Sequence, residues 1–261
     1  MRARTRPGGG RPAPHESATP PTVALERALS KLGLASRSQA RRLIMDGRVE
    51  VDGRLVRDPR ARVVPERARI RLDRTDRPAA ARLTVALHKP RGVITTRSDP
   101  DGRPTVYSLL TGLEAHVVPV GRLDLATSGL LLLTNDTRLA DWLTDPASGV
   151  PRVYLVTVRG RVTDEEVARL TSGLDSRGER LAATAAVLRK ASSRESHLVV
   201  TLTEGRNREV RRLVEGIGHE VTRLRRVQIG GLELGTLAPR AWRVLDDEEL
   251  ARAFPGYRRR G

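Results

Sequence analysis

The sequence predicts an α+β protein, with a small N-terminal module and a larger domain built on a mixed, mostly antiparallel β-sheet. Residues 22–72 show two short helical patterns followed by a hairpin signal. Residues 83–245 show short strand patterns separated by frequent turns, with a few helices between them. Strands and helices do not alternate regularly, so a doubly wound parallel sheet is not expected.

The N-terminal module is predicted to contain two helices and a hairpin. The first helix follows an apolar pattern at helical spacing across residues 23–32 and ends at Gly33. Ser36 and Gln39 have the spacing of a capping box, which predicts the start of a second helix. A hairpin is expected across residues 49–56, because Asp-Gly joins two alternating runs there.

The larger domain is predicted from short runs rich in Val and Leu, each bounded by turn residues. Thr163 and Glu166 form a capping box at the start of one of its helices. The expected strands are 83–88, 117–120, 129–133, 153–158, 183–188, 197–202 and 221–229, and the expected helices are 135–143, 164–170 and 208–215.

Three further segments complete the expected domain organisation. Residues 1–21 are rich in Arg, Pro and Gly and lack an apolar period, which indicates a disordered basic tail. Residues 73–82 are polar and contain a proline, so we interpret them as a linker. Residues 246–261 are expected to form a C-terminal helix and a second basic tail.

The net charge of +17 indicates a polyanionic partner, most simply a nucleic acid. Nearly all the positive charge is arginine, whose planar guanidinium matches phosphate oxygens. Residues 1–82 hold 20 Arg and Lys against 9 Asp and Glu, so the first third carries +11. A GC-rich genome explains the choice of arginine over lysine, but it does not explain the excess of base over acid.

Arg37, Arg41 and Arg42 project from the second helix of the N-terminal module, with Arg37 and Arg41 one turn apart on one face. A single arginine there is most simply part of a solvated helix face. A cluster beside a tight turn favours contact with RNA phosphates, and we predict RNA binding at these three residues.

The composition also excludes several kinds of chemistry. The chain has no cysteine, which rules out disulfides, thiolate nucleophiles and Cys-based zinc sites. The five histidines show no metal-ligand spacing, and neither a P-loop nor a dinucleotide-binding motif occurs. We therefore expect no metal and no cofactor. Aromatic residues are only 2%, which disfavours an RNA surface built from stacked rings.

The sequence also bears on location. No apolar run approaches the roughly 20 residues that cross a bilayer. The N-terminus lacks the apolar core of a secretory signal. We expect a cytoplasmic protein without a membrane partner, and a monomer as the default.

Two polar segments interrupt otherwise apolar stretches. Residues 121–124, Gly-Arg-Leu-Asp, place a carboxylate in a glycine turn beside an apolar strand. An Asx-turn is the simpler interpretation of Asp124 taken alone. Residues 204–212 form a glycine turn rich in arginine that opens a helix, where the helix N-terminus already favours anions. A charged surface turn is the alternative there.

Three motifs resemble the bacterial ribosomal RNA pseudouridine synthases of the small-subunit type and their large-subunit relatives. They are residues 87–93 (LHKPRGV), residues 121–136 (GRLDLATSGLLLLTND) and residues 204–213 (EGRNREVRRL). Residues 22–72 resemble the alpha-L RNA-binding module that precedes the catalytic domain in this family. The resemblance implies an isomerase that converts a uridine of ribosomal RNA, preferentially of the large subunit, to pseudouridine. The substrate is ribosomal RNA or a subunit precursor.

The resemblance also implies roles for individual residues. Asp124 matches the essential aspartate, which attacks or deprotonates the target sugar. Tyr154 matches the tyrosine that packs on the uracil, and Leu224 matches an apolar pocket wall. Arg122 matches the arginine that holds the place of the flipped-out base. Arg211 matches the basic residue paired with the aspartate.

We expect RNA binding at Lys89, Arg206 and Arg208. For Lys89 and Arg206 the alternative is that they support the cleft. A non-catalytic RNA-binding or ribosome-assembly factor on the same scaffold is the competing function. A third hypothesis, another RNA-acting enzyme, needs a cofactor or metal motif that the sequence does not provide.

Overall fold

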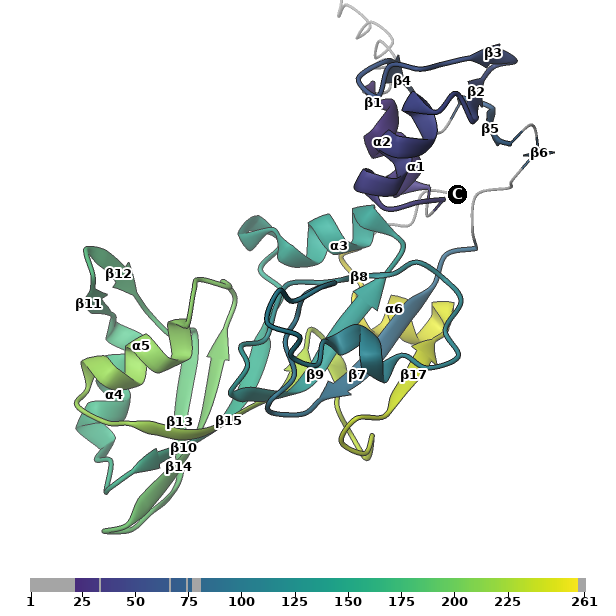
Figure 1. Ribbon diagram of the computed structural model, residues 1–261. Helices are drawn as coiled ribbons and strands as arrows, with labels where there is room; N and C mark the ends of the chain where they lie inside the picture. Colours follow the sequence, from purple (N-terminus) through teal and green to yellow (C-terminus); the bar gives the residue numbers. More distant parts are fainter. Residues whose placement is uncertain (1–21, 33, 66, 74, 77–80, 258–261) are drawn as a thin grey trace, which may run out of the picture.

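The computed structural model describes residues 22–257 apart from residues 33, 66, 74 and 77–80 (Figure 1). The expected basic segments 1–21 and 258–261 lie outside the described residues. Figure 1 shows the N-terminal module as a separate body beside the larger domain.

The N-terminal module contains the predicted helix pair and hairpin. Both side-chain bonds of the Ser36–Gln39 capping box form. Asp52 and Gly53 take the positive φ values, 51° and 79°, that a tight hairpin turn requires. Its elements are α1 (Leu25–Lys31), α2 (Arg37–Met45), β2 (Val49–Val51), β3 (Arg54–Leu55) and β5 (Ile70–Leu72).

Two expectations for this region were wrong. Val23 was counted in the first helix, but Val23–Ala24 forms β1, which pairs with β4 (Arg62–Val63). The expected linker 73–82 is not wholly a linker, because Thr75–Asp76 forms β6 and extends the sheet in the order β3-β2-β5-β6. Both strands have two residues, too few for a local apolar pattern; β1 pairs with the distant β4, whereas β6 pairs with the preceding strand β5.

The larger domain is built on one mixed sheet, with a main strand order of β13-β14-β10-β15-β9-β7-β17. Every neighbouring pair on this path is antiparallel except β15 and β9. The strands are β7 (Thr84–Lys89), β8 (Val118–Pro119), β9 (Thr127–Thr134), β10 (Arg152–Arg159), β13 (Ala185–Ala191), β14 (Glu195–Leu202), β15 (Val221–Ile229), β16 (Leu232–Glu233) and β17 (Trp242–Leu245).

Helices and a hairpin flank this sheet (Figure 1). Side chains of α4 and α5 pack with those of β10, β14 and β15 in one core cluster. A small hairpin, β11 (Leu174–Ser176) and β12 (Glu179–Leu181), lies against α5. The helices are α3 (Thr137–Thr144), α4 (Asp164–Ser172), α5 (Glu209–Gly216) and α6 (Asp247–Ala253), with 3-10 turns η1 (Val106–Leu109) and η2 (Pro146–Ser148).

The boundary expected at residue 245 does not divide the structure. β17 pairs with β7 along the edge of the sheet. Leu250 and Phe254, in and just after α6, are buried in the same core cluster as Leu132 and Leu245. The C-terminal helix is therefore part of the larger domain, because its apolar face closes that core.

The centre of the sheet is where β15 and β9 run parallel. They pair over three positions, from Leu224 opposite Thr127 to Arg226 opposite Gly129. A Cβ on Gly129 would lie 2.1 Å from the Arg226 carbonyl oxygen, so only glycine permits this approach. Both strands are longer than the paired segment, so they diverge and leave space between the two halves of the sheet.

Candidate active site

A cleft of about 280 Å³ lies at this central point of the larger domain. Small-molecule cavities span roughly 300–1,000 Å³, so the cleft suits a single nucleoside rather than a duplex. Six residues singled out from the sequence line it: Arg122, Asp124, Tyr154, Arg206, Arg208 and Leu224.

Asp124 lies in a loop, residues 121–126, that is fixed by backbone contacts. Thr127 N–H donates to the Asp124 carbonyl at 3.0 Å and closes the turn. The Thr95 hydroxyl donates to the Leu123 carbonyl at 2.8 Å. Gly92 N–H donates to the Leu125 carbonyl at 2.9 Å. The carboxylate of Asp124 is 40% exposed, and the fixed loop directs it at the cleft.

Lys89 holds the same loop in place through hydrogen bonds to backbone carbonyls. Its side chain is fully buried, and Nζ donates to the carbonyls of Pro90, Asp124 and Thr127 at 2.8–3.1 Å. Burial lowers the pKa of this ammonium to about 8, an effect that the nearby Asp124 partly offsets. The expected contact between Lys89 and an RNA phosphate is therefore not available in this structure, and Lys89 supports the cleft instead.

The arginine that pairs with Asp124 is Arg208. Its Nη1 lies 4.0 Å from the Asp124 carboxylate, across the cleft. Arg211, which was expected in this role, is buried and donates to the carbonyls of Val221 and Ala126 at 3.2 and 3.4 Å. Burial and the neighbouring Arg208 lower the pKa of Arg211, while Asp124 raises it. Arg211 thus acts on Asp124 over a longer range than a direct ion pair.

Arg208 owes its position to an unusual backbone conformation. Its φ of 50° is in the left-handed region, and it is the N-cap residue directly before α5. Strained backbone of this kind persists where the surroundings fix it. Arg206 N–H donates to the Glu209 carboxylate at 3.1 Å and ties the turn to the first residue of the helix.

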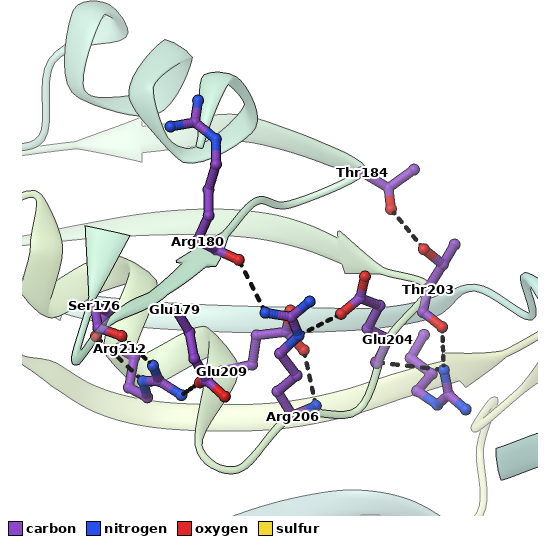
Figure 2. Close-up of polar contacts among 10 residues, drawn as sticks. Ser176, Glu179, Arg180, Thr184, Thr203, Glu204, Arg206, Glu209 and Arg212 are labelled. Atoms are coloured by element: carbon purple, nitrogen blue, oxygen red, sulfur yellow. Dashed lines mark hydrogen bonds and ion pairs between the residues drawn. The ribbon is translucent and has the colours of Figure 1, made fainter. Parts of the chain in front are cut away.

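Contacts from the β11–β12 hairpin hold the arginine-rich turn, residues 204–208, and the helix that follows it (Figure 2). Arg206 bonds the Glu204 carboxylate at 2.5 Å and the Arg180 carbonyl at 2.9 Å. Arg212 bonds the Glu179 carboxylate at 2.7 Å and the Ser176 carbonyl at 2.5 Å. Through Arg206 and Arg212, the hairpin is thus bonded to the chain on both sides of Arg208.

Arg152 supports the cleft from the start of β10. It is buried and donates to the carbonyls of Leu143, Val150, Thr203 and Glu204. Burial lowers its pKa, the effect expected when a cation is removed from water. Arg152 thereby joins α3 to the arginine-rich turn.

The apolar wall of the cleft consists of Tyr154 and Leu224. Tyr154 lies on β10 and is 9% exposed, and Leu224 lies on the neighbouring β15 and is 5% exposed. Arg122, in contrast, is exposed at the rim, next to the glycine turn at Gly121. The cleft therefore combines an apolar wall, one carboxylate and several arginines.

The cleft residues that sequence reasoning did not assign to the site include Thr127, Arg152 and Arg226. Arg226 follows Leu224 by two positions on a strand, which places both side chains on the same face of the sheet. That alternation was the available signal.

Within the described ranges, no three or more His, Asp or Glu side chains gather as a metal ion would require. The same ranges contain no helix that is long and apolar enough to cross a membrane.

Comparison with known proteins finds two families along the chain. Residues 83–215 match the RNA pseudouridylate synthase family, and residues 25–67 match the S4 domain. An uncharacterized RNA pseudouridine synthase of Aquifex aeolicus is 36% identical over 89% of this chain and 94% of its own. The ribosomal large subunit pseudouridine synthase B of Yersinia pestis is 40% identical over 85% of this chain and 72% of its own.

A crystal structure of a pseudouridylate synthase superimposes with a TM-score of 0.60 at 26% identity, over 88% of this chain and 99% of that one. The family and the α+β fold class expected from the sequence are confirmed. The family match also includes the residue 121–126 loop and the arginine-rich turn that form the cleft. The chain belongs to the RNA pseudouridine synthases and carries an S4 domain at its N-terminal side.

Proposed function

We propose that this synthase converts a uridine of ribosomal RNA to pseudouridine, that the RNA is that of the large subunit, and that Asp124 is its catalytic carboxylate. One observation carries the assignment of the residue: the fixed loop presents Asp124 to a nucleoside-sized cleft that Tyr154 also lines. Similarity to the ribosomal large subunit pseudouridine synthases B of Yersinia pestis and Escherichia coli supports the choice of RNA.

The geometry supports a base-flipping mechanism. The target uridine leaves its stack at a cost of about a few kcal/mol, which contacts with the RNA offset. Its uracil packs on Tyr154 and against Leu224, and Arg122 at the rim takes the place that the base has left. Because the wall is apolar, water is kept from the sugar while the glycosidic bond is open.

Asp124 reacts with the target sugar, either by adding to it or by removing a proton from it. The bond from C1′ to N1 breaks, the ring turns, and C5 bonds to C1′. No electrons enter or leave overall. The guanidinium of Arg208 lies 4.0 Å from the Asp124 carboxylate and places a positive charge beside the reacting group.

RNA phosphates are bound on both parts of the chain. Arg37, Arg41 and Arg42 are exposed on α2 of the S4 domain. Arg206 and Arg208 are partly exposed beside the cleft. These arginines hold the RNA, or a precursor of the ribosomal subunit, while the target base enters the cleft.

The test is Asp124→Asn, with Asp141→Asn as a matched control, because Asp141 is an exposed carboxylate on α3. We expect Asp124→Asn to form no pseudouridine on a large-subunit rRNA transcript while its affinity for the transcript stays within a few-fold of wild type. Asp141→Asn keeps full activity. Normal modification by Asp124→Asn would remove it from the reaction.

The RNA is identified by deleting the gene and mapping pseudouridine across the host's ribosomal RNA by carbodiimide-stop sequencing. We expect one large-subunit position to be lost, and to return with wild-type protein but not with Asp124→Asn. An unchanged map, together with no activity of the purified protein on free rRNA or subunit precursors, would favour a non-catalytic binding factor.

A further inference from the structure

Two buried side chains that line the cleft, Thr127 and Arg226, each have a polar atom without a hydrogen-bond partner. Thr127 is 2% exposed, and its hydroxyl makes no hydrogen bond. Arg226 is 3% exposed, and its Nη2 makes none either. Buried polar atoms are nearly always hydrogen-bonded, because leaving one unpaired in an apolar site costs stability. Two such atoms in one cleft indicate a ligand that supplies the missing partners.

The sheet register places these two groups beside the apolar wall. Arg226 is directly opposite Tyr154 on the neighbouring strand, and Thr127 is directly opposite Leu224. Side chains directly opposite one another on a sheet lie about 5 Å apart. Gly129, opposite Arg226, brings the two strands close enough for both groups to share one floor.

The orientation of Arg226 is fixed. Its Nε donates to the Leu130 carbonyl at 2.8 Å, which holds the plane of the guanidinium. Its Nη2 finds no acceptor among the described residues. A guanidinium only donates, so the missing partner is an acceptor, and it is favoured if it carries negative charge.

A uracil ring that lies on Tyr154 meets these requirements. Its O2 and O4 are acceptors at its edge. When the bond from C1′ to N1 breaks with its electron pair passing to N1, the negative charge of the ring spreads onto O2 and O4. Once C5 has bonded to C1′, C5 releases its proton and N1 takes one up, which completes the isomerisation and returns the ring to neutrality.

We propose that Arg226 and Thr127 bind the edge of the target uracil, with Arg226 donating to a ring carbonyl and stabilising the ring while it is detached from the sugar. This inference rests on the proposed function. It predicts that the two residues act mainly on the rate of the chemical step, because their contacts strengthen as charge develops on the base.

The main experiment compares Arg226→Ala with Arg225→Ala. Arg225 is the neighbouring, exposed arginine on the opposite face of β15, so its loss changes the net charge equally. Removing a donor that stabilises developing charge lowers kcat by roughly 10²–10³-fold. We expect such a loss for Arg226→Ala, with the Kd for RNA within about three-fold of wild type. Arg225→Ala keeps kcat.

Guanidinium rescue separates a direct role from a structural one. We expect low-millimolar guanidinium to restore kcat of Arg226→Ala at least ten-fold, whereas urea, which has the same shape without the charge, does not. Equal rescue by both, or an unchanged kcat without any addition, would overturn the proposal. A loss confined to RNA affinity would assign Arg226 to a phosphate and would also overturn it.

Thr127→Val tests the second group and does not depend on how Arg226→Ala folds. Valine has the shape of threonine without the hydroxyl, so a folded protein is expected. We expect kcat to fall about ten-fold, the effect of one neutral hydrogen bond, while Ser128→Ala on the other face of β9 has no effect. A normal kcat for Thr127→Val contradicts its part in the proposal.

Wild-type protein on the same transcript keeps the two proposals distinguishable. If wild type does not modify ribosomal RNA, the proposed substrate is wrong, and the comparison is repeated on the RNA that it does modify. If wild type is active and the Arg226 and Thr127 variants retain its kcat, the uracil-edge inference alone fails.

Discussion

Lys89 is a buried cation whose function depends on its surroundings. Its ammonium holds three carbonyls, including that of Asp124, and burial lowers its pKa from about 10.5 to about 8. Because the folded protein holds this proton less tightly than the unfolded chain, the unfolded chain binds more protons between pH 8 and 10.5. The contribution of Lys89 to the free energy of unfolding therefore rises as the pH increases from 8 to 10.5. Below pH 8 this gain is absent, because the buried ammonium stays charged.

Lys89→Met tests this linkage. We expect the difference in free energy of unfolding, wild type minus variant, to increase by up to about 3 kcal/mol from pH 8 to 10.5, as measured by urea denaturation. Lys190→Met, which removes an exposed lysine, is the control for the loss of one positive charge. A difference for Lys89→Met that stays constant across this pH range would mean that its pKa is not lowered.

Gly129 is a second residue whose identity is fixed by its neighbours. Its φ is +112°, and an added Cβ would collide with the Arg226 backbone. We expect Gly129→Ala to lower the free energy of unfolding by about 3 kcal/mol or more, since overpacking and an unfavourable backbone add together. Thermal denaturation measures this, and Gly178→Ala, at an open positive-φ turn, gives the smaller cost of the backbone alone.

At the scale of elements, the β11–β12 hairpin and α5 act as one unit because Arg212 joins them. Arg212 is 7% exposed and bonds both Ser176 and Glu179. The start of the same helix presents Arg208 to Asp124. Arg212 therefore affects the geometry of the cleft although it does not line it.

We expect Arg212→Met to speed amide hydrogen exchange in residues 174–181 and at the start of α5, because the variant loses the bonds from Arg212 to Ser176 and Glu179 that join the hairpin to the helix. We also expect kcat to fall several-fold while RNA affinity holds. Arg177→Met, at the exposed tip of the same hairpin, removes the same charge and leaves exchange in α5 unchanged. Equal exchange in both variants would show that the two elements are not coupled.

At the scale of the whole molecule, affinity and chemistry are assigned to different parts of the chain. The S4 domain carries the exposed arginines of α2, and the sheet of the larger domain carries the cleft. Neutralising phosphates releases counterions, so contacts with the RNA backbone make binding depend on salt. Residues that only bind the backbone change affinity and its salt dependence, not the rate at saturation.

We therefore expect Arg37, Arg41 and Arg42, replaced together by Gln, to weaken RNA binding and to reduce the slope of log affinity against log salt by about 2–3. The kcat at saturating RNA is unchanged. A triple variant that loses the same charge at Arg161, Arg189 and Arg194, all exposed, shows a smaller change in slope. Identical slopes in the two triple variants would mean that α2 is not the phosphate-binding face.

The sequence by itself determined the parts that depend on local chemistry. The capping boxes at Ser36 and Thr163 mark helix starts, because their bonds join residues three apart. Short apolar runs bounded by turns, without a regular alternation of strands and helices, predicted the fold class. The motifs around the residue 121–126 loop and the arginine-rich turn indicated the family. The resemblance to that family then predicted Asp124, Tyr154 and Leu224 as cleft residues, and all three line the cleft.

The tertiary structure alone decided which polar groups meet. The short strands β1 and β17 exist only through partners far along the chain. The sequence shows a lysine at position 89, but only the folded structure shows that it is buried beside the residue 121–126 loop. There it donates to backbone carbonyls of the cleft, where an RNA contact was expected. Likewise Arg208 pairs with Asp124, while Arg226 Nη2 and the Thr127 hydroxyl lack a partner. Burial and the supply of hydrogen-bond partners depend on strands that the chain brings together only on folding.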